Sequence, residues 1–305
     1  MEPVKEKCIG AIDVVEIGRP GPGAIKVGGE TCMPFLLEEG AMPNSPVVAM
    51  EILDCEPSDW PDNLRSALGK AASDPVSWAK FAVGECGCGL ICVRMQSAHP
   101  DWKNATSEAA VSILKKISKA VNVPLVVIGS GDDVKDSDLM PKVSQALKGE
   151  RALLGSAAQN NYKTITAIAL ADGHSIIAES PIDINIAKQL NILVTDMGMP
   201  QHRIVMHPTT ASLGYGMEYT YSIMERSRLA AFTGDRMLAM PFVLFPGAES
   251  WRVKEAKDAS ETGGMNWELV TSVVMLQAGA DILVMRDPGA IRETMKYINN
   301  MTPKL

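Results

Sequence analysis

The feature that most constrains the fold is a repeated alternation of short apolar runs and longer helix-like segments. The β-like runs occupy 46–53, 89–95, 124–130, 151–155, 174–179, 203–207, 241–245 and 281–285. The helix-like segments occupy 74–86, 106–121, 135–148, 160–172, 183–197, 217–232, 264–278 and 287–300. Eight strand–helix units, repeating at roughly thirty residues, predict a (β/α)8 barrel of the TIM type.

The composition of these runs supports parallel strands. The runs are apolar throughout, as expected of parallel strands that are covered by helices. Asp74-Pro75 and Asp287-Pro288 have the N-cap and first-turn proline of a helix start, and Gly173 suits a helix end. A doubly wound open sheet is the alternative, but no G-x-G-x-x-G follows the first strand.

One domain is expected over residues 1–305, because no linker-like boundary interrupts the alternation. Before the first unit, two short β-like runs flank the Gly/Pro-rich turn GRPGPG. This pattern predicts a β-hairpin over residues 9–28, which we expect to close the bottom, N-terminal end of the barrel.

Charge and hydropathy exclude several classes of function. Hydrophobic residues make up 46% of the chain, which is enough for a large core, and the formal net charge is −7. An acidic chain without a long Lys/Arg run is a poor partner for nucleic acid or anionic lipid. The N-terminus lacks the apolar core of a signal peptide, and every apolar run is shorter than a membrane span. A soluble cytoplasmic protein is the expectation.

Half of the six cysteines lie in the segment GECGCGLIC, at Cys86, Cys88 and Cys92. A usual iron–sulfur cluster or structural zinc site needs four protein ligands. In a barrel, the first two of these cysteines fall on the N-terminal face and the third falls inside a strand. We therefore interpret the segment as a turn and expect no metal site on this chain.

The working face of such a barrel is the C-terminal end of its strands. The segments that follow the strands are rich in Gly, Ser, Thr, Asn and Pro, which suits an uncharged rim that hydrogen-bonds a large, polar-edged ligand. The loop after the sixth strand, from Thr209 to Gly216, is the most distinctive. His207 before a proline is interpreted as structural, whereas Glu51 could bind a ligand or pair with Arg286.

Long strings of the sequence resemble one known family. They are LLGSAAQNNYKTITAIALADGHSIIAESPIDINIAKQLNILVTDMGMP, HPTTASLGYGMEYTYSIMERSRLAA, ESWRVKEA and WELVTSVVMLQAGADILVMRDPGAI, with IKVGGE, MPFLLEEG, PVVAMEILD and DPVSWAK nearer the start. Together they resemble the small subunit of the corrinoid iron–sulfur protein. The archaeal counterpart of that subunit is the delta subunit of the acetyl-CoA decarbonylase/synthase complex.

The resemblance implies a (β/α)8 barrel that forms a heterodimer with a large subunit. It also implies that a cobalamin-type corrinoid lies at the interface, capped by this chain, while the [4Fe–4S] cluster belongs to the large subunit. In that family the cobalt takes a methyl group from methyltetrahydrofolate through a methyltransferase and delivers it to CO dehydrogenase/acetyl-CoA synthase. This chain would then be a non-catalytic carrier subunit in the reductive acetyl-CoA pathway.

Rim position selects the expected corrinoid contacts, which are Thr209, Thr210, Gly214, Tyr215, Ser180, Asp183, Gly129 and Ser130. No catalytic or metal-ligating residue is expected. One alternative is a pterin-binding corrinoid methyltransferase on the same barrel, with Asp132, Asp183 and Asn185 holding the pterin. A second alternative is an interaction subunit that binds no cofactor. A metal-dependent hydrolase is disfavoured, because only His99 and His207 lie at strand ends.

Overall fold

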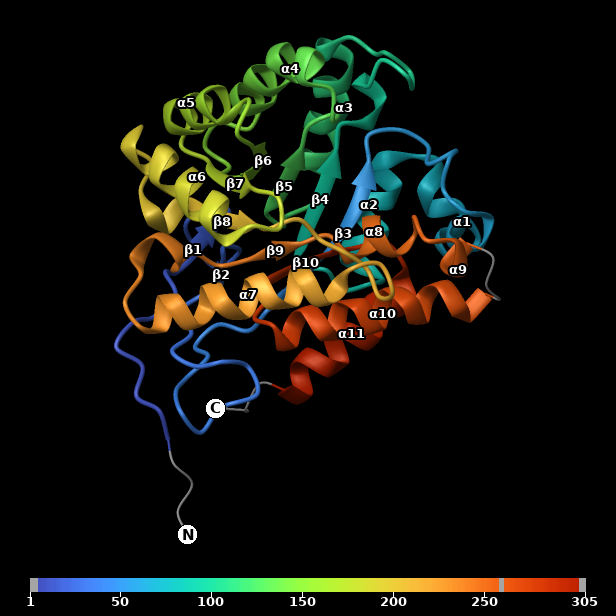
Figure 1. The fold of residues 1–305 in the computed structure, drawn as a ribbon. Coiled ribbons are helices and arrows are strands. Elements are labelled where there is room, and N and C mark those ends of the chain that lie inside the picture. Colours follow the sequence, from blue (N-terminus) through green and yellow to red (C-terminus); the bar gives the residue numbers. More distant parts are fainter. Residues whose placement is uncertain (1–4, 258–260, 302–305) are drawn as a thin grey trace.

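The chain folds around a barrel of eight parallel strands in a computed structural model that describes residues 5–257 and 261–301 (Figure 1). The strands run in the order β8-β7-β6-β5-β4-β3-β10-β9. A parallel bridge between Met206 and Phe242 joins the two outer strands and closes the barrel. The bounds of the eight strands are β3 Val47–Leu53, β4 Leu90–Arg94, β5 Leu125–Ile128, β6 Leu153–Ala157, β7 Ser175–Glu179, β8 Ile204–His207, β9 Val243–Leu244 and β10 Ile282–Met285.

Helices follow the strands and surround the barrel (Figure 1). The eight predicted helices correspond to α2 Pro75–Gly84, α3 Ser107–Ala120, α4 Asp133–Ala146, α5 Tyr162–Asp172, α6 Ile184–Asp196, α7 Met217–Phe232, α10 Glu261–Gln277 and α11 Pro288–Met301. The (β/α)8 prediction is confirmed. Three short helices were not predicted, namely α1 Asp62–Leu68, α8 Pro246–Ser250 and α9 Lys254–Lys257.

Local sequence signals set the helix ends. The Asp74 carboxylate accepts the Ser77 backbone N–H at 2.8 Å, and Asp287 accepts the backbone N–H of Ala290 at 2.9 Å. Gly173 ends α5 in the left-handed region, at φ 85°, where a side chain would be strained. These positions agree with the predicted helix starts and end.

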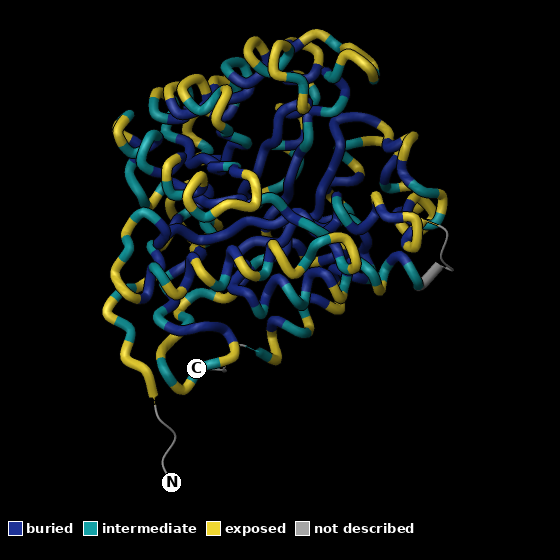
Figure 2. The backbone as a smooth tube through the Cα atoms, in the orientation of Figure 1, coloured by how far each residue is buried: buried dark blue, intermediate teal, exposed yellow. Residues whose placement is uncertain are grey.

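The two faces of the strands belong to two different cores. Side chains that point outward pack with the helices in one large buried cluster, whereas inward side chains such as Ala49, Cys92 and Val284 form a second cluster inside the barrel. Figure 2 shows the strands as a continuous buried layer beneath partly exposed helices. The period of two therefore decides which residue at each strand end points into the barrel mouth.

A two-stranded antiparallel sheet, β1 Val15–Ile17 with β2 Ile25–Val27, precedes the barrel. The two strands cover only part of the hairpin predicted over residues 9–28. Val15, Ile17 and Val27 are buried in the inner cluster with residues that begin strands, including Leu90 and Leu153. The hairpin thus packs against the N-terminal ends of the barrel strands.

Candidate functional site

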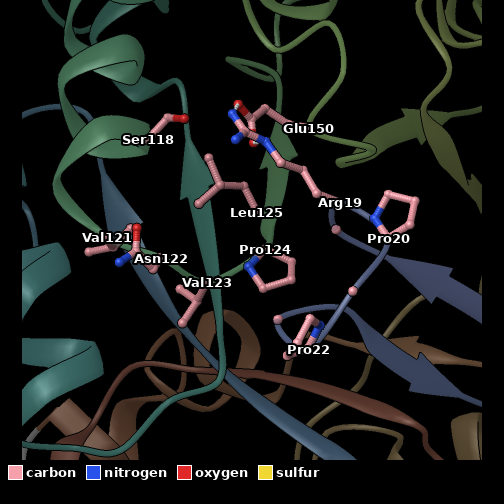
Figure 3. Close-up of a pocket in the computed structure, with 13 residues that line it drawn as sticks. Arg19, Pro20, Pro22, Ser118, Val121, Asn122, Val123, Pro124, Leu125 and Glu150 are labelled. Carbon is pink, nitrogen blue, oxygen red and sulfur yellow. Dashed lines mark hydrogen bonds and ion pairs between the residues drawn. The ribbon is translucent and has the colours of Figure 1, made fainter.

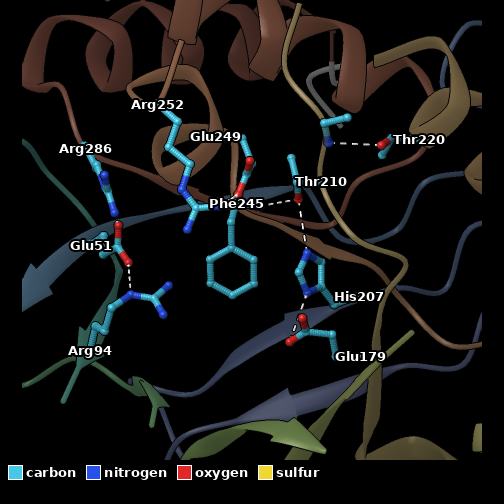
Figure 4. A network of polar contacts seen from close by, with 11 residues as sticks. Glu51, Arg94, Glu179, His207, Thr210, Thr220, Phe245, Glu249, Arg252 and Arg286 are labelled. Carbon is cyan, nitrogen blue, oxygen red and sulfur yellow. Dashed lines mark hydrogen bonds and ion pairs between the residues drawn. The ribbon is translucent and has the colours of Figure 1, made fainter. Parts of the chain in front are cut away.

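Six large side chains form the uppermost layer of the barrel interior, at the C-terminal ends of the strands (Figure 4). Each follows an inward-facing residue by two positions, so the pleat points it into the mouth. They are Glu51, Arg94, Glu179, His207, Phe245 and Arg286. This layer is mostly charged, whereas the layers below it are apolar.

Glu51 sits between two arginines at the centre of one half of the mouth. Arg94 Nε donates to Glu51 Oε1 at 2.6 Å, and Arg286 Nε donates to Oε2 at 2.5 Å. Burial alone would raise the pKa of this fully buried carboxyl, but the two guanidiniums outweigh it and lower the pKa to about 2. Of the two expectations for Glu51, pairing with Arg286 is the one found.

His207 is held in the other half of the mouth. Its Nε2 lies 3.2 Å from Thr210 Oγ1, and its Nδ1 lies 3.5 Å from a Glu179 carboxylate oxygen. Because the Thr210 hydroxyl accepts the Phe245 N–H at 2.8 Å, its own proton can be donated to Nε2, leaving the imidazole proton on Nδ1 beside Glu179. Burial would raise the pKa of Glu179, but hydrogen bonding and attraction to His207 lower it to about 2. The histidine is thus held between Thr210 and Glu179, although its buried Nδ1 has no hydrogen-bond partner within normal distance.

The loop from Thr209 to Gly216 is anchored on both sides. Thr209 has φ +58°, a strained conformation for a β-branched residue, and its hydroxyl donates to the Ser180 carbonyl at 2.7 Å. On the far side, Trp267 Nε1 donates to the Leu213 carbonyl at 3.1 Å, and the Tyr215 hydroxyl bonds Glu255 at 2.8 Å. The loop therefore ties β7 to α9 and α10 across the rim.

Two pockets open on this C-terminal face. The larger, of about 860 Å³, is lined by Ala158, Gln159, Asn160, Glu179, Ser180, Pro181, Ile186, Gln189, Leu190, Leu193 and Thr209. The smaller, of about 430 Å³, is lined by Leu53, Asp59, Trp60, Pro61, Arg94, Gln96, His99, Ser130, Gly131, Ala248, Trp251, Arg252, Lys257 and Arg286. The predicted contacts Ser180 and Thr209 meet in the first pocket, and Ser130 lies in the second.

Several other predicted contact residues are used to build the rim. Thr210 is buried with its hydroxyl engaged, and the Asp183 carboxylate caps α6 by accepting the backbone N–H groups of residues 185 and 186. The Asp136 carboxylate accepts both the backbone N–H and the hydroxyl of Ser130, and it packs against Gly129. Gly214 has φ +77° and lies near Trp267 rather than in either pocket. Tyr215 is half exposed.

The expectation of an uncharged rim is wrong. Arg94, Arg252, Lys257 and Arg286 all line the smaller pocket, and of these only Arg286 had been singled out. Arg94 could have been found from the sequence, since it ends an apolar run and keeps the inward phase of Cys92. Arg252 and Lys257 reach the mouth through the short helices α8 and α9, whose placement required the tertiary structure.

The opposite end of the barrel carries a different cleft. A pocket of about 270 Å³ lies between the hairpin turn and the loop before β5, and an ion pair between Arg19 and Glu150 borders it (Figure 3). Cys86 and Cys88 are buried in the segment that enters β4, and Cys92 points into the barrel. In the described ranges, no cluster of three His, Cys, Asp or Glu side chains has the arrangement of a metal site. Within those same ranges, no helix is both long and apolar enough to cross a bilayer.

Solved structures place the barrel in a recognisable class. Dihydropteroate synthase from Xanthomonas albilineans aligns with a TM-score of 0.58 at 12% identity, over 86% of this chain and 93% of that one. The enzyme from Coxiella burnetii, solved with pteroic acid, aligns with a TM-score of 0.58 at 13% identity, over 89% and 98%. The chain thus has the (β/α)8 fold seen in these synthases.

Sequence comparison identifies the family within that class. The family described as CO dehydrogenase/acetyl-CoA synthase delta subunit matches residues 14–301. The delta subunit of the acetyl-CoA decarbonylase/synthase complex of Methanopyrus kandleri is 35% identical, over 91% of this chain and 70% of its own length. That of Methanocaldococcus jannaschii is 32% identical, over 99% and 77%. The chain belongs to this delta-subunit family.

Proposed function

We propose that this chain is the barrel subunit of a corrinoid methyl carrier and covers the corrinoid at an interface with a large subunit. In this proposal the large subunit carries the [4Fe–4S] cluster. A methyltransferase loads the methyl group from methyltetrahydrofolate, and CO dehydrogenase/acetyl-CoA synthase receives it. The relatives are named as subunits of a multi-subunit complex, which supports a role that depends on partners.

The observation that carries the proposal is the position of the exposed apolar side chains. Five large apolar residues that remain exposed follow strands at the C-terminal rim, namely Val134, Ile182, Ile186, Tyr215 and Tyr219. They begin helices or precede them after β5, β7 and β8, so they lie along the half of the rim that runs from β5 to β8. Apolar surface gathered around a pocket is typical of a surface that a partner or a large ligand covers.

The larger pocket has the chemistry to hold the edge of a corrin ring. Gln159 presents an amide, Asn160 presents its amide oxygen while its nitrogen bonds Asp133, Ile186 presents apolar surface, and the Thr209–Ser180 pair fixes the wall between β7 and α7. Such groups can hydrogen-bond the neutral amide side chains of a corrinoid while its apolar ring covers the rim. When bound, the corrinoid would supply the cobalt that accepts and gives up the methyl group.

The expected contact set can therefore be ordered. Ser180 and Thr209 are proposed as direct contacts because they line the larger pocket, and Tyr215 is proposed as one because it stands exposed on the rim. Thr210 and Asp183 are proposed to act indirectly, since their polar groups hold His207 and α6 in place. Gly129, Ser130 and Gly214 shape the neighbouring loops. His207 is buried with its Nε2 beside Thr210, and it is proposed to shape the mouth and not to contact the corrinoid.

Corrinoid retention in the reconstituted heterodimer tests the proposal. A Tyr215→Ala, Tyr219→Ala double variant is expected to lower the visible corrinoid absorbance per heterodimer. Phe35→Ala is the matched control, because Phe35 is a half-exposed aromatic residue before β3, away from the rim. Equal retention in the rim variant and the control would contradict the proposed cover.

A pterin-binding methyltransferase is the second candidate, and the fold shared with dihydropteroate synthases favours it. The carboxylates that would hold the pterin are otherwise engaged. Asp132 Oδ1 accepts the Lys135 N–H at 2.7 Å, and Asp183 caps α6. Turnover of methyltetrahydrofolate with free cob(I)alamin by the isolated chain would favour this candidate over the carrier subunit.

A further inference from the structure

We propose that the smaller mouth pocket binds a phosphate oxyanion, with Arg94 and Arg286 as its principal donors. The inference rests on the geometry of the mouth and not on the proposed function. No corrinoid contact assigned above depends on these two arginines.

Glu51 orients both guanidiniums before any ligand arrives. Each arginine uses its Nε on one oxygen of the buried carboxylate. The described residues offer no hydrogen-bond partner to the Nη atoms of either arginine, and both side chains line the pocket. The Arg286 guanidinium also lies over the Trp60 ring, 4.4 Å from its centroid. Figure 4 shows the two arginines reaching Glu51 of β3 from its two sides, Arg94 from β4 and Arg286 from the end of β10.

This arrangement leaves two planar forks whose orientation is already fixed. A guanidinium recognises phosphate through paired N–H donors, and it does so more tightly when its side chain need not be ordered on binding. If the arginines served only to neutralise Glu51, one of them would suffice. The second arginine leaves the Glu51 cluster itself with one net positive charge, and Glu179 is the other carboxylate of the mouth layer that acts on Arg94.

The surrounding charges point the same way. Four cationic side chains line the pocket, namely Arg94, Arg252, Lys257 and Arg286, against a single lining carboxylate, Asp59. Glu51 beneath them and Glu249, which pairs with Arg252 at 2.8 Å, reduce the excess at this pocket to one positive charge, and Glu179 lines the other pocket of the mouth. Within a chain of net charge −7, such a concentration attracts an anion to this point of the surface.

The shape of the pocket narrows the ligand class. Its volume of about 430 Å³ exceeds what a bare ion needs, and Trp60 and Trp251 contribute apolar wall. A phosphate attached to a larger, partly apolar molecule fits this combination of fork donors and aromatic surface. The phosphate could belong to a free metabolite or to the phosphodiester in the nucleotide tail of a corrinoid.

Calorimetric titration of the full chain with inorganic phosphate, at ionic strength held constant with chloride, tests the site. Arg252→Gln and Lys257→Gln are each expected to weaken phosphate binding about three- to tenfold, since both residues lie at the solvent side of the pocket. Arg94→Lys keeps the charge beside Glu51 but removes the fork, so a loss of about tenfold or more is expected. The matched control is Arg226→Gln, on the exposed side of α7, which should leave binding unchanged.

Absence of phosphate binding in the parent chain would overturn the site, as would equal weakening by the control variant. If Arg94→Lys fails to fold, the two solvent-side variants decide the matter. A second arm identifies the source of the phosphate. Competition by cobalamin but not by cobinamide, which lacks the phosphodiester, would assign the site to a corrinoid tail, whereas competition by neither would assign it to a free phosphate ester. Corrinoid retention by the heterodimer is measured separately, so the two proposals can fail independently.

Discussion

Replacing Glu51 by Gln is expected to destabilise the barrel by about 3 kcal/mol at pH 7. The carboxylate is fully buried and bonds two arginines that are themselves mostly buried. The variant would keep the shape of the side chain but leave two guanidinium charges without a counter-ion. Removing one partner of a buried ion pair typically costs about 3–5 kcal/mol.

The pKa of Glu51 gives a second route to the magnitude. The two arginines lower it from the ordinary value of 4.5 to about 2. Each pKa unit corresponds to about 1.4 kcal/mol, so preferential stabilisation of the ionised form contributes about 3 kcal/mol to folding. The two routes agree because the same attraction underlies both.

The pH dependence follows from the direction of the shift. Because the pKa in the folded state is lowered, the stabilisation is fully present above pH 4.5 and is lost as pH falls towards 2. At pH 4 the unfolded carboxyl is largely protonated and the folded one is not, so about 0.8 kcal/mol of the contribution is already lost. The difference between the parent chain and Glu51→Gln should therefore narrow between pH 7 and pH 4.

Urea unfolding followed by tryptophan fluorescence measures this difference, and Trp60, stacked on Arg286, reports on the site itself. Glu150→Gln is the matched control, because it breaks an ion pair with Arg19, which is largely solvent-exposed. Exposed pairs contribute less than about 1 kcal/mol. If Glu51→Gln and Glu150→Gln lost the same stability, or if the Glu51 effect stayed constant down to pH 4, the reasoning would be refuted.

Three further outcomes are expected. Thr209→Ala should be about 1 kcal/mol less stable than Thr209→Gly in thermal melting. Both variants lose the hydrogen bond to Ser180, but only glycine relieves the strain of the positive φ. Equal melting temperatures of the two variants would contradict this prediction. Cys8 is the least buried of the six cysteines, so its thiol should be the first to react with a disulfide reagent at pH 8. Burial raises the pKa of the Cys86 thiol to about 11, which slows its reaction. Fast labelling of several thiols in the folded protein would contradict this prediction. Ile17→Ala should cost about 2–5 kcal/mol in urea unfolding, since this hairpin side chain is fully buried against the barrel; a loss below 1 kcal/mol would show that the hairpin packs loosely.

Local sequence predicted most of the fold, because its signals act over short distances. Asp74, Asp287 and Gly173 mark helix ends by chemistry confined to one turn. The apolar runs marked all eight strands within a few residues. The short helices α1, α8 and α9 were not predicted, although Pro246 opens α8, because they span only seven, five and four residues and form in long connections whose path depends on contacts with the barrel.

The candidate site was predictable only in outline. Rim position selected Ser180 and Thr209, and the structure brings both to the larger pocket. It overlooked Arg94 and treated Asp183 as a ligand contact, although the structure uses its carboxylate to cap α6. Local composition cannot distinguish a polar group that is free for a ligand from one already bonded to the protein.

The sequence by itself determined the barrel and the family, and it predicted the end of the barrel at which binding is proposed, because periodicity and motif are properties of the chain. Only the tertiary structure decided the charge of the mouth. Glu51, Arg94 and Arg286 are far apart in sequence, and they meet because the closing barrel places β4, β3 and β10 side by side. An ion network of this kind depends on distances and burial, and both are set when the strands pair.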